Sequence, residues 1–242
     1  MDRERLSVYI NSLDDQYSPL LRRIAKEAAG EGVPIVRKET ASLLKTLTVM
    51  KRPSRILEVG TAVGYSALLL AENAPRECRI TTIEKDGRRA MQARENFERA
   101  GRGKQITLLE GDAAQILPGL SAPFDFIFMD AAKGQYIHFL EDVLRLLKPG
   151  GLLISDNVLQ DGSILESRFM VERRDRTIHS RMREYLYTIT HHALLTTAVL
   201  ATGDGVAVSV RAWNEGCEAA AENVCTDGTA DRLRELRGDG EE

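Results

Sequence analysis

The sequence has few cysteines, and their spacing excludes two kinds of protein. Cys78, Cys217 and Cys225 are an odd number without a CxxC pair, so they describe neither a disulfide framework nor a zinc site. No apolar run approaches the length that spans a bilayer, and the charged start MDRERLSVYI lacks the apolar core of a secretory signal. These absences predict a cytoplasmic protein that does not enter a membrane.

The chain has no internal repeat and no linker that would divide it. Its 242 residues are enough for one well-buried domain. Residues 214–242 differ from the rest, because they carry nine acids against three arginines, a net charge of −6. That stretch is also poor in large apolar side chains, a composition that cannot bury enough surface to fold. We predict a single domain over residues 1–213 and an acidic, disordered tail over residues 214–242.

The apolar pattern predicts an α/β fold. Residues 1–50 have helical periodicity, which indicates two or three extra N-terminal helices. From Arg55 on, five short apolar runs alternate with helical segments, the last of them from Glu166 to about Ile189, and two further runs around GDG form a closing hairpin. Continuous apolar strands separated by helices indicate a mostly parallel seven-stranded sheet with helices on both faces.

The stretch EVGTAVGYS stands where the first strand should turn into its helix. Doubly wound folds bring backbone amides to a ligand at that point, and Gly60 and Gly64 allow a close approach. The spacing is GxxxG and lacks the third glycine of the dinucleotide fingerprint. The match to a nicotinamide or flavin site is therefore weak.

Acidic residues end four of the predicted strands in succession. Glu84, Asp112, Asp130 and Asp156 each follow a strand, and Glu58 stands just before the glycine turn. One acid after a strand is often a helix cap, but the carboxyl ends of parallel strands share one edge of a sheet. Many carboxylates there would repel a pyrophosphate and suit a cation. This favours the sulfonium of S-adenosylmethionine (SAM) as the cofactor.

Four ordered motifs carry a resemblance to a known family. EVGTAVGYS, FIFMDAAKGQY, LKPGGLLISDNVL and GDGVAVS together resemble the metal-dependent class I O-methyltransferases related to catechol and caffeoyl-CoA O-methyltransferases. The likeness covers about residues 1–213 and is closest to bacterial tRNA 5-hydroxyuridine methyltransferases, which make 5-methoxyuridine at the wobble position. It implies a Rossmann-like methyltransferase fold, and a homodimer formed through the N-terminal helices or the sheet edge.

The resemblance also implies roles for individual residues. Val36 falls where relatives often have Met, so the chain departs from the pattern there. Three metal ligands are implied at two neighbouring strand ends, and hard oxygen donors of this kind suit Mg²⁺, with Mn²⁺ as the alternative ion. The metal ligands are Asp130, Asp156 and Asn157. The cofactor-binding residues are Val36, Glu58, Gly60, Ser66, Glu84, Asp112, Ala113 and Asp130.

The stretch FDFIFMDAAKGQY places an amine three positions after a carboxylate. A hydroxyl becomes a strong nucleophile only when it loses its proton, and a lysine beside a cation is favoured in its neutral, proton-accepting form. Asp130 and Lys133 are therefore the predicted catalytic residues, with Asp130 holding the metal and Lys133 acting as the base. Tyr136 either packs on the substrate or is a core residue.

An arginine-rich segment follows the fifth strand and favours an RNA substrate. It could bind the phosphates and bases of a tRNA anticodon loop, although a solvated helix face would have the same composition. The alternatives are a small-molecule catechol or caffeoyl-CoA O-methyltransferase and a non-catalytic RNA-binding module. His179, His191 and His192 are expected at the surface or as helix caps. The predicted RNA-binding residues are Arg168, Arg173, Arg174, Arg176, Arg181 and Arg183.

Overall fold

The structure is a computed structural model that describes residues 3–13, 17–121, 123–167 and 170–213. Two predictions lie outside the described residues, namely the acidic tail at 214–242 and the RNA-binding role of Arg168. The chain groups into two compact units, Met1–Gly119 and Leu120–Glu242. The prediction of a single domain over residues 1–213 stays a prediction.

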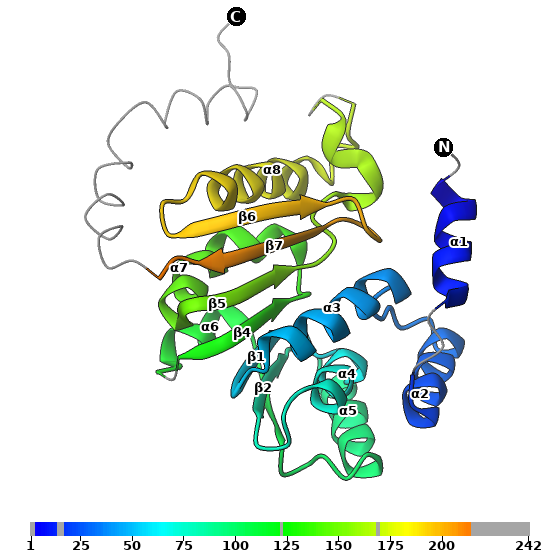
Figure 1. Cartoon of the computed structure of the whole chain (residues 1–242). Helices are drawn as coiled ribbons and strands as arrows, with labels where there is room; N and C mark the ends of the chain where they lie inside the picture. The colour runs from blue at the N-terminus through cyan, green and yellow to red at the C-terminus, as the bar shows by residue number, and fades with distance from the viewer. Residues whose placement is uncertain (1–2, 14–16, 122, 168–169, 214–242) are drawn as a thin grey trace, which may run out of the picture. The chain divides into compact units, whose positions relative to one another are not determined.

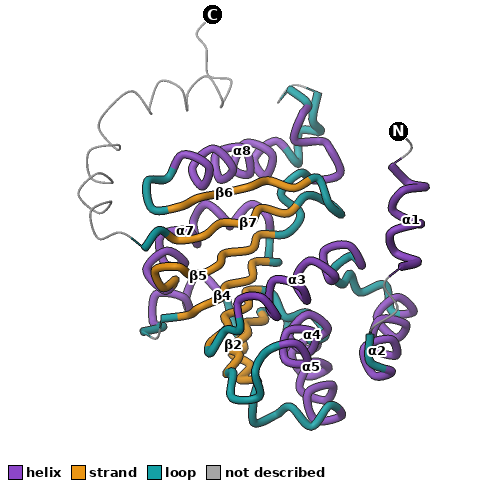
Figure 2. Tube along the Cα trace, in the orientation of Figure 1, coloured by secondary structure: helices purple, strands orange, loops and turns teal. Residues whose placement is uncertain are grey.

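The first unit alternates helices and strands after an all-helical start (Figures 1 and 2). Its three strands are parallel and lie in the order β3-β2-β1. The elements are α1 (Arg3–Leu13), α2 (Pro19–Gly30), α3 (Lys38–Lys51), β1 (Arg55–Val59), α4 (Tyr65–Asn73), β2 (Arg79–Glu84), α5 (Gly87–Arg99), β3 (Ile106–Glu110), α6 (Ala113–Ile116) and the 3₁₀-helix η1 (Leu117–Gly119).

Local sequence explains where these elements begin and which of their faces are buried. Ser18 caps α2 by accepting a hydrogen bond from the Leu21 amide at 3.2 Å, and Pro19 occupies the first helical turn. In β1, Ile56, Leu57 and Val59 are all fully buried. A strand buried on both faces is expected in a parallel sheet covered by helices. The carboxyl end of β1 is therefore supported by a strand that is packed on both faces.

Helix α1 is held to α3 by polar contacts and leaves apolar side chains in solvent. Glu39 on α3 accepts hydrogen bonds from Ser7 and, at 2.9 Å, from Asn11. Val8, Tyr9 and Leu13 are 62–67% exposed.

None of the helices in the described ranges combines the length and apolar character needed to cross a membrane.

In the second unit the strands lie in the order β4-β5-β7-β6. β4 and β5 are parallel, whereas β7 is antiparallel to both β5 and β6, so the predicted closing hairpin is confirmed. Helix α8 runs along β6 in Figure 1. The elements are β4 (Phe124–Met129), the 3₁₀-helix η2 (Lys133–Gln135), α7 (Tyr136–Leu146), β5 (Leu147–Ser155), the 3₁₀-helix η3 (Gln160–Leu165), α8 (Arg176–His191), β6 (Leu195–Leu200) and β7 (Val206–Arg211).

Helix α8 begins ten residues later than its sequence predicts. The expected start was Glu166, but the helix starts at Arg176. The described residues just before it are largely exposed, and Arg174 forms ion pairs with its chain neighbours Glu172 and Asp175 at 2.9 and 3.5 Å. Helix formation in a protein depends on an apolar face that packs against the core. That face begins only at His179, followed by Met182 and Tyr185.

Candidate active site

The glycine turn after β1 adopts a backbone conformation that few residues tolerate. Gly60, Ala62 and Gly64 have φ values of 103°, 45° and 84°, all on the left-handed side of the map, where glycine is favoured. The turn leads directly into α4, because Gly64 is the N-cap residue of that helix. Backbone amides and a helix N-terminus thus meet at the position where the sequence predicts the cofactor.

Glu84 at the end of β2 holds this turn from one side. Its Oε2 accepts a hydrogen bond from the Ala62 amide at 2.7 Å, and its Oε1 accepts one from the Asp86 amide at 2.9 Å. The side chain is 8% exposed. Because each carboxylate oxygen can accept more than one hydrogen bond, Glu84 retains the capacity to bind the hydroxyls of a ligand ribose.

Three other predicted cofactor residues are buried within the first unit. Glu58 is fully buried and accepts a hydrogen bond from the Thr82 hydroxyl on the neighbouring strand. Val36 and Ser66 are each 7% exposed. Glu58 is therefore suited to supporting β1 and β2 beneath the turn, rather than to a direct contact with a ligand.

Asp112 after β3 is a helix cap, as a single acid in this position often is. It accepts a hydrogen bond from the Ala114 amide at 3.0 Å and lies next to the buried Ala113 at the start of α6. Lys85 donates to it at 2.7 Å. The hydrogen bond from Lys85, together with that from Ala114, lowers the pKa of Asp112, so this carboxylate stays ionised and can accept a hydrogen bond from a ligand.

In the second unit, acidic side chains gather at the ends of β4 and β5. Burial, together with the neighbouring charges of Asp156 and Asp204 and against the opposing effect of Lys133, raises the pKa of Asp130 to about 7. The carboxylates of Asp130, Asp156 and Asp204 repel one another when they are ionised. A positive charge beside these side chains would reduce that repulsion.

Asp156 and Asn157 are fixed by the backbone around them. The Asp156 carboxylate accepts a hydrogen bond from the Asn157 amide at 2.8 Å, and the Asp156 amide donates to the carbonyl of Met129 at 3.0 Å. Asn157 has a left-handed φ of 58°, which Asn tolerates better than most residues. The two predicted ligands therefore have defined orientations at the end of β5.

Asp204 in the turn between β6 and β7 belongs to this acidic group, and the motif analysis missed it as a site residue. Its Oδ2 accepts a hydrogen bond from the Asn157 side-chain amide at 3.2 Å. The signal is present in the sequence as GDG, which marks the hairpin turn and begins the GDGVAVS motif of the resemblance, but no site role is predicted for its aspartate. An Asn amide whose nitrogen donates in this way leaves its oxygen available as a ligand.

Two buried tyrosines connect the strand ends to the helices behind them. The Tyr136 hydroxyl lies 3.1 Å from the Met129 carbonyl and 3.2 Å from the Asp156 carbonyl, and the side chain is fully buried. Tyr185 on α8 contacts Tyr136 edge to face and shares a 2.6 Å hydrogen bond with Ser155. The core interpretation of Tyr136 therefore holds, and its hydroxyl joins the ends of β4 and β5.

Lys133 is half-buried at the start of η2, which packs closely against α8. A side chain on the buried Gly134 would come within 3.4 Å of Ile178, and Arg181 donates to the Gly134 carbonyl at 3.3 Å. Helix α8 thus fixes the short segment that carries the candidate base.

The arginines of the predicted RNA-binding segment fall into two groups. Arg173 and Arg174 are exposed. Arg176, Arg181 and Arg183 instead donate to backbone carbonyls at 3.2, 3.3 and 3.5 Å, the last at the limit of hydrogen bonding. The backbone of the second unit therefore positions these three side chains, which keep their positive charge and further N–H donors.

One histidine prediction is wrong. His179 is 2% exposed on the inner face of α8, and within the described part of the chain neither ring nitrogen has a hydrogen-bond partner. The expectation of a surface or capping role rests on its distance from the strand-end acids in the predicted topology, which does not report whether a helix face is buried. His191 does act at the helix end, where its Nδ1 lies 2.9 Å from the Tyr187 carbonyl.

Histidine, cysteine and acidic side chains do not by themselves form a metal site of three or more groups among the residues that the structure describes. The set predicted from sequence contains only two such side chains, Asp130 and Asp156, and takes its third oxygen from the amide of Asn157. Its chemistry, hard oxygen donors beside a further carboxylate, fits Mg²⁺ better than a softer ion.

Comparison with known proteins identifies the family. Residues 8–212 match the O-methyltransferase family, so the chain belongs to it. A catechol O-methyltransferase from Niastella koreensis is 35% identical over 169 residues, which are 67% of this chain and 76% of the relative. A solved structure that is similar to this chain is the SAM complex of TomG, an O-methyltransferase from Streptomyces achromogenes involved in tomaymycin synthesis. The two structures have a TM-score of 0.77 at 27% identity, and the match covers 88% of this chain and 99% of TomG.

A second solved structure agrees with the first. The O-methyltransferase from Bacillus cereus in complex with S-adenosylhomocysteine (SAH) has a TM-score of 0.76 at 25% identity, covering 86% of this chain and 97% of its own. The chain is thus a SAM-dependent O-methyltransferase of the catechol and caffeoyl-CoA type. The predicted Rossmann-like methyltransferase fold, with seven mostly parallel strands, is confirmed.

Proposed function

We propose that this enzyme methylates a hydroxyl group that has a second oxygen on the adjacent atom, with Mg²⁺ at Asp130, Asp156 and Asn157. The observation that carries the proposal is the group of acidic side chains at the ends of β4 and β5, in which burial and the charges of Asp156 and Asp204 raise the pKa of Asp130 to about 7. A site of this kind is stabilised when a cation binds. Mg²⁺ there would supply the positive charge that makes the acceptor hydroxyl acidic.

The glycine turn and Glu84 are the proposed cofactor site. SAM supplies a methyl group on a positively charged sulfur. Glu84, already held by the Ala62 amide, would accept the ribose hydroxyls. Asp112 and Ala113 would border the adenine, and Asp112 is kept ionised by Lys85. The left-handed backbone at Gly60 and Gly64 fits a ligand that approaches the main chain closely.

Lys133 is the proposed base. Its neutral Nζ would accept the proton of the acceptor hydroxyl, and the resulting oxygen anion would take the methyl group from SAM, which would leave as SAH. The close packing of α8 on Gly134 limits the positions that the segment carrying Lys133 can take. Correct placement of reacting groups supplies a large part of the rate enhancement in such reactions, so this packing supports the assignment.

A small catechol-type phenol is the proposed acceptor. Two observations support it. The relatives include catechol O-methyltransferases, and Arg176, Arg181 and Arg183 donate to backbone carbonyls, which occupies one N–H donor of each and restricts where these side chains can reach. A catechol presents two neighbouring oxygens to a metal with two open positions.

A second candidate acceptor is 5-hydroxyuridine at the wobble position of tRNA, which would give 5-methoxyuridine. Its base offers the same pair of oxygens in the 5-hydroxyl and the 4-carbonyl. The observation that favours it is the exposure of Arg173 and Arg174 just before α8, where guanidinium groups could contact an anticodon loop.

Methyl transfer from labelled SAM separates the two acceptors. The enzyme is incubated with a catechol and, separately, with tRNA that carries 5-hydroxyuridine. We expect label in the catechol, and an unchanged rate in the Arg173→Glu, Arg174→Glu double variant. Label in the tRNA alone, lost in that variant, would replace the catechol by RNA as the substrate. Label in neither acceptor, with SAH still bound, would contradict the proposed acceptor chemistry.

We also propose that the enzyme is a homodimer formed through α1. The support is the apolar surface of this helix, on which Val8, Tyr9 and Leu13 are 62–67% exposed, because contiguous exposed apolar side chains mark interaction sites. Light scattering after size-exclusion chromatography should give twice the chain mass, and Val8→Glu with Leu13→Glu should give a single chain. A monomeric wild-type protein would contradict this.

A further inference from the structure

The cofactor turn has a second side-chain contact besides the one with Glu84. The side-chain nitrogen of Asn96 on α5 donates to the carbonyl of Val63 at 2.9 Å, and Asn96 is 6% exposed. A backbone with left-handed residues, such as Ala62 with φ 45°, persists only when its surroundings fix it. The Asn96 contact is one of the bonds that fix this turn.

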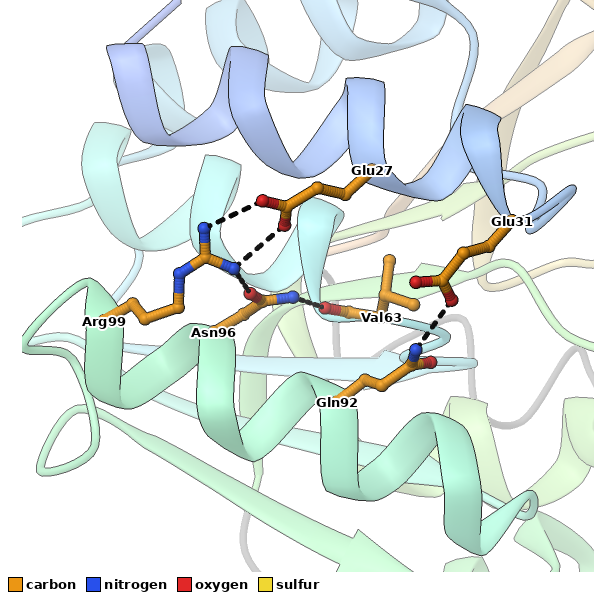
Figure 3. A network of polar contacts seen from close by, with 6 residues as sticks. All are labelled: Glu27, Glu31, Val63, Gln92, Asn96 and Arg99. Atoms are coloured by element: carbon orange, nitrogen blue, oxygen red, sulfur yellow. Dashed lines mark hydrogen bonds and ion pairs between the residues drawn. The ribbon is translucent and has the colours of Figure 1, made fainter.

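The orientation of the Asn96 amide is itself determined by a neighbour. Arg99 donates to the Asn96 oxygen at 2.8 Å, and a guanidinium group can only donate. The oxygen of Asn96 must therefore face Arg99, and its nitrogen must face Val63. Arg99 in turn donates to both carboxylate oxygens of Glu27 on α2, at 2.9 and 3.2 Å. Figure 3 shows this series of contacts from α2 to the turn.

Helix α5 also contacts the turn through its apolar side chains. A Cβ atom on Gly64 would lie 2.6 Å from the Phe97 ring and 3.3 Å from Ala93. Helix α5 therefore packs directly against the turn, and the series Glu27, Arg99 and Asn96 joins that helix to α2.

We propose that Asn96, oriented by Arg99 and Glu27, is a positioning residue for the cofactor turn, and that α2 thereby sets the affinity for SAM. This rests on the proposed function, since it takes the turn at Gly60–Gly64 as the cofactor site. Asn96 does not touch the cofactor in this scheme. It acts through the Val63 carbonyl, which fixes the amides that face the ligand.

A contribution to the stability of the fold does not by itself explain the contacts that link Glu27, Arg99 and Asn96. The side chains of Glu27 and Arg99 are 47% and 36% exposed, and ion pairs this open to water contribute little to folding. The hydrogen bond from Arg99 lowers the pKa of Glu27, so the pair is ionised at neutral pH. Removal of Glu27 should therefore leave the fold intact and change the orientation of Asn96.

The chain offers a matched control for each change. Glu31, which follows α2 directly, accepts a hydrogen bond from Gln92 on α5 at 2.8 Å, so it links the same two segments without a contact to the turn. Asn73 on α4 donates to the Leu69 carbonyl at 2.8 Å. Each Asn→Asp change replaces an amide nitrogen that donates to a carbonyl by a carboxylate oxygen that cannot donate. Asn73→Asp therefore makes the same chemical change as Asn96→Asp, but away from the turn.

Calorimetric titration with SAH tests the proposal without catalysis. We expect Asn96→Asp to raise the Kd for SAH about tenfold, the effect of one lost hydrogen bond, and Glu27→Ala to raise it about threefold. Asn73→Asp and Glu31→Ala should bind SAH as the wild type does. In steady-state kinetics Asn96→Asp should raise KM for SAM and leave kcat at saturating SAM and KM for the acceptor unchanged.

Two results would overturn the inference. One is wild-type affinity for SAH in both Glu27→Ala and Asn96→Asp. The other is an equal loss in each variant and its control, which would mean general destabilisation. A wild-type protein that does not bind SAH would instead contradict the proposed function, so the two failures are distinguishable.

Discussion

The side-chain nitrogen of Asn157 lies 3.2 Å from the carboxylate of Asp204, which follows it 47 residues later in the chain. The backbone holds the two segments together, because Val158 donates to the Gly205 carbonyl at 3.0 Å and Leu159 donates to the Asp204 carbonyl at 2.9 Å. The hairpin between β6 and β7 therefore orients a candidate metal ligand at the end of β5.

Asp204→Ala should weaken metal binding, because the Asn157 amide would lose the acceptor that fixes its orientation. Loss of such a supporting contact typically costs about 10- to 100-fold in metal affinity. Electron paramagnetic resonance of Mn²⁺ titrated into the protein measures this directly. The matched control is Asp142→Ala, which removes a carboxylate paired with Arg145 on α7 and should leave Mn²⁺ affinity unchanged. Equal affinities in both variants would contradict the role of Asp204.

Lys133→Gln should lower kcat by about 10²- to 10⁴-fold, the usual contribution of a general base. The Kd for SAH should not change, because the cofactor site is assigned to other residues. Lys133→Arg should be equally slow, since an arginine keeps the charge but does not give up its proton. Lys148→Gln, which removes the partner of Asp125, serves as the control. A Lys133→Gln enzyme with wild-type kcat would rule out the proposed base.

The metal-free protein should lose stability as the pH rises. The pKa of Asp130 is raised from 3.8 to about 7 by burial and by the charges of Asp156 and Asp204. A carboxyl group with a raised folded-state pKa stabilises the fold fully below pH 3.8, and this contribution is lost as the pH rises through 7. Mg²⁺ should therefore raise Tm more at pH 8 than at pH 5.5.

Thermal unfolding with Mg²⁺ and with EDTA at both pH values measures this difference. Asp130→Asn should remove most of it, because the amide does not titrate. If Mg²⁺ raises Tm equally at the two pH values, Asp130 is not the group that exchanges its proton for the ion.

Tyr185→Phe should lower the free energy of unfolding by about 1 to 3 kcal/mol, because the buried Ser155 hydroxyl would lose its partner. Tyr187 is the control, since it lies two residues further on the same helix, half-buried and stacked on His191. Tyr187→Phe should change stability by less than about 0.5 kcal/mol. Urea unfolding of both variants measures the difference, and equal effects would contradict the role given to Tyr185.

The sequence was sufficient to predict the alternation of strands and helices, because buried parallel strands have continuous apolar runs that end in recognisable turns. It also located Asp130, Asp156 and Asn157 at strand ends, since each follows such a run directly. Asp204 could not be assigned in the same way. Its partner Asn157 is distant in the chain, and local pattern does not report which turn lies beside which strand.

The arginine-rich segment shows a second limit of prediction from sequence, which concerns the contacts of charged side chains. Phosphate binding by these arginines stays a prediction, and composition did not indicate that Arg181 and Arg183 also donate to backbone carbonyls of η2 and of Glu166. A long cation can bury its stem and satisfy a carbonyl without leaving any trace in the charge pattern. His179 is buried for a different reason, because the elements that pack against α8 decide which of its faces is buried.

The most direct test of the account is methyl transfer from labelled SAM to a catechol with and without EDTA. We predict that EDTA abolishes transfer, that excess Mg²⁺ restores it, and that Asp156→Asn stays inactive in both conditions while it still binds SAH. Transfer at an unchanged rate in EDTA would contradict the account, because the acidic group at the ends of β4 and β5 would then have no part in the reaction.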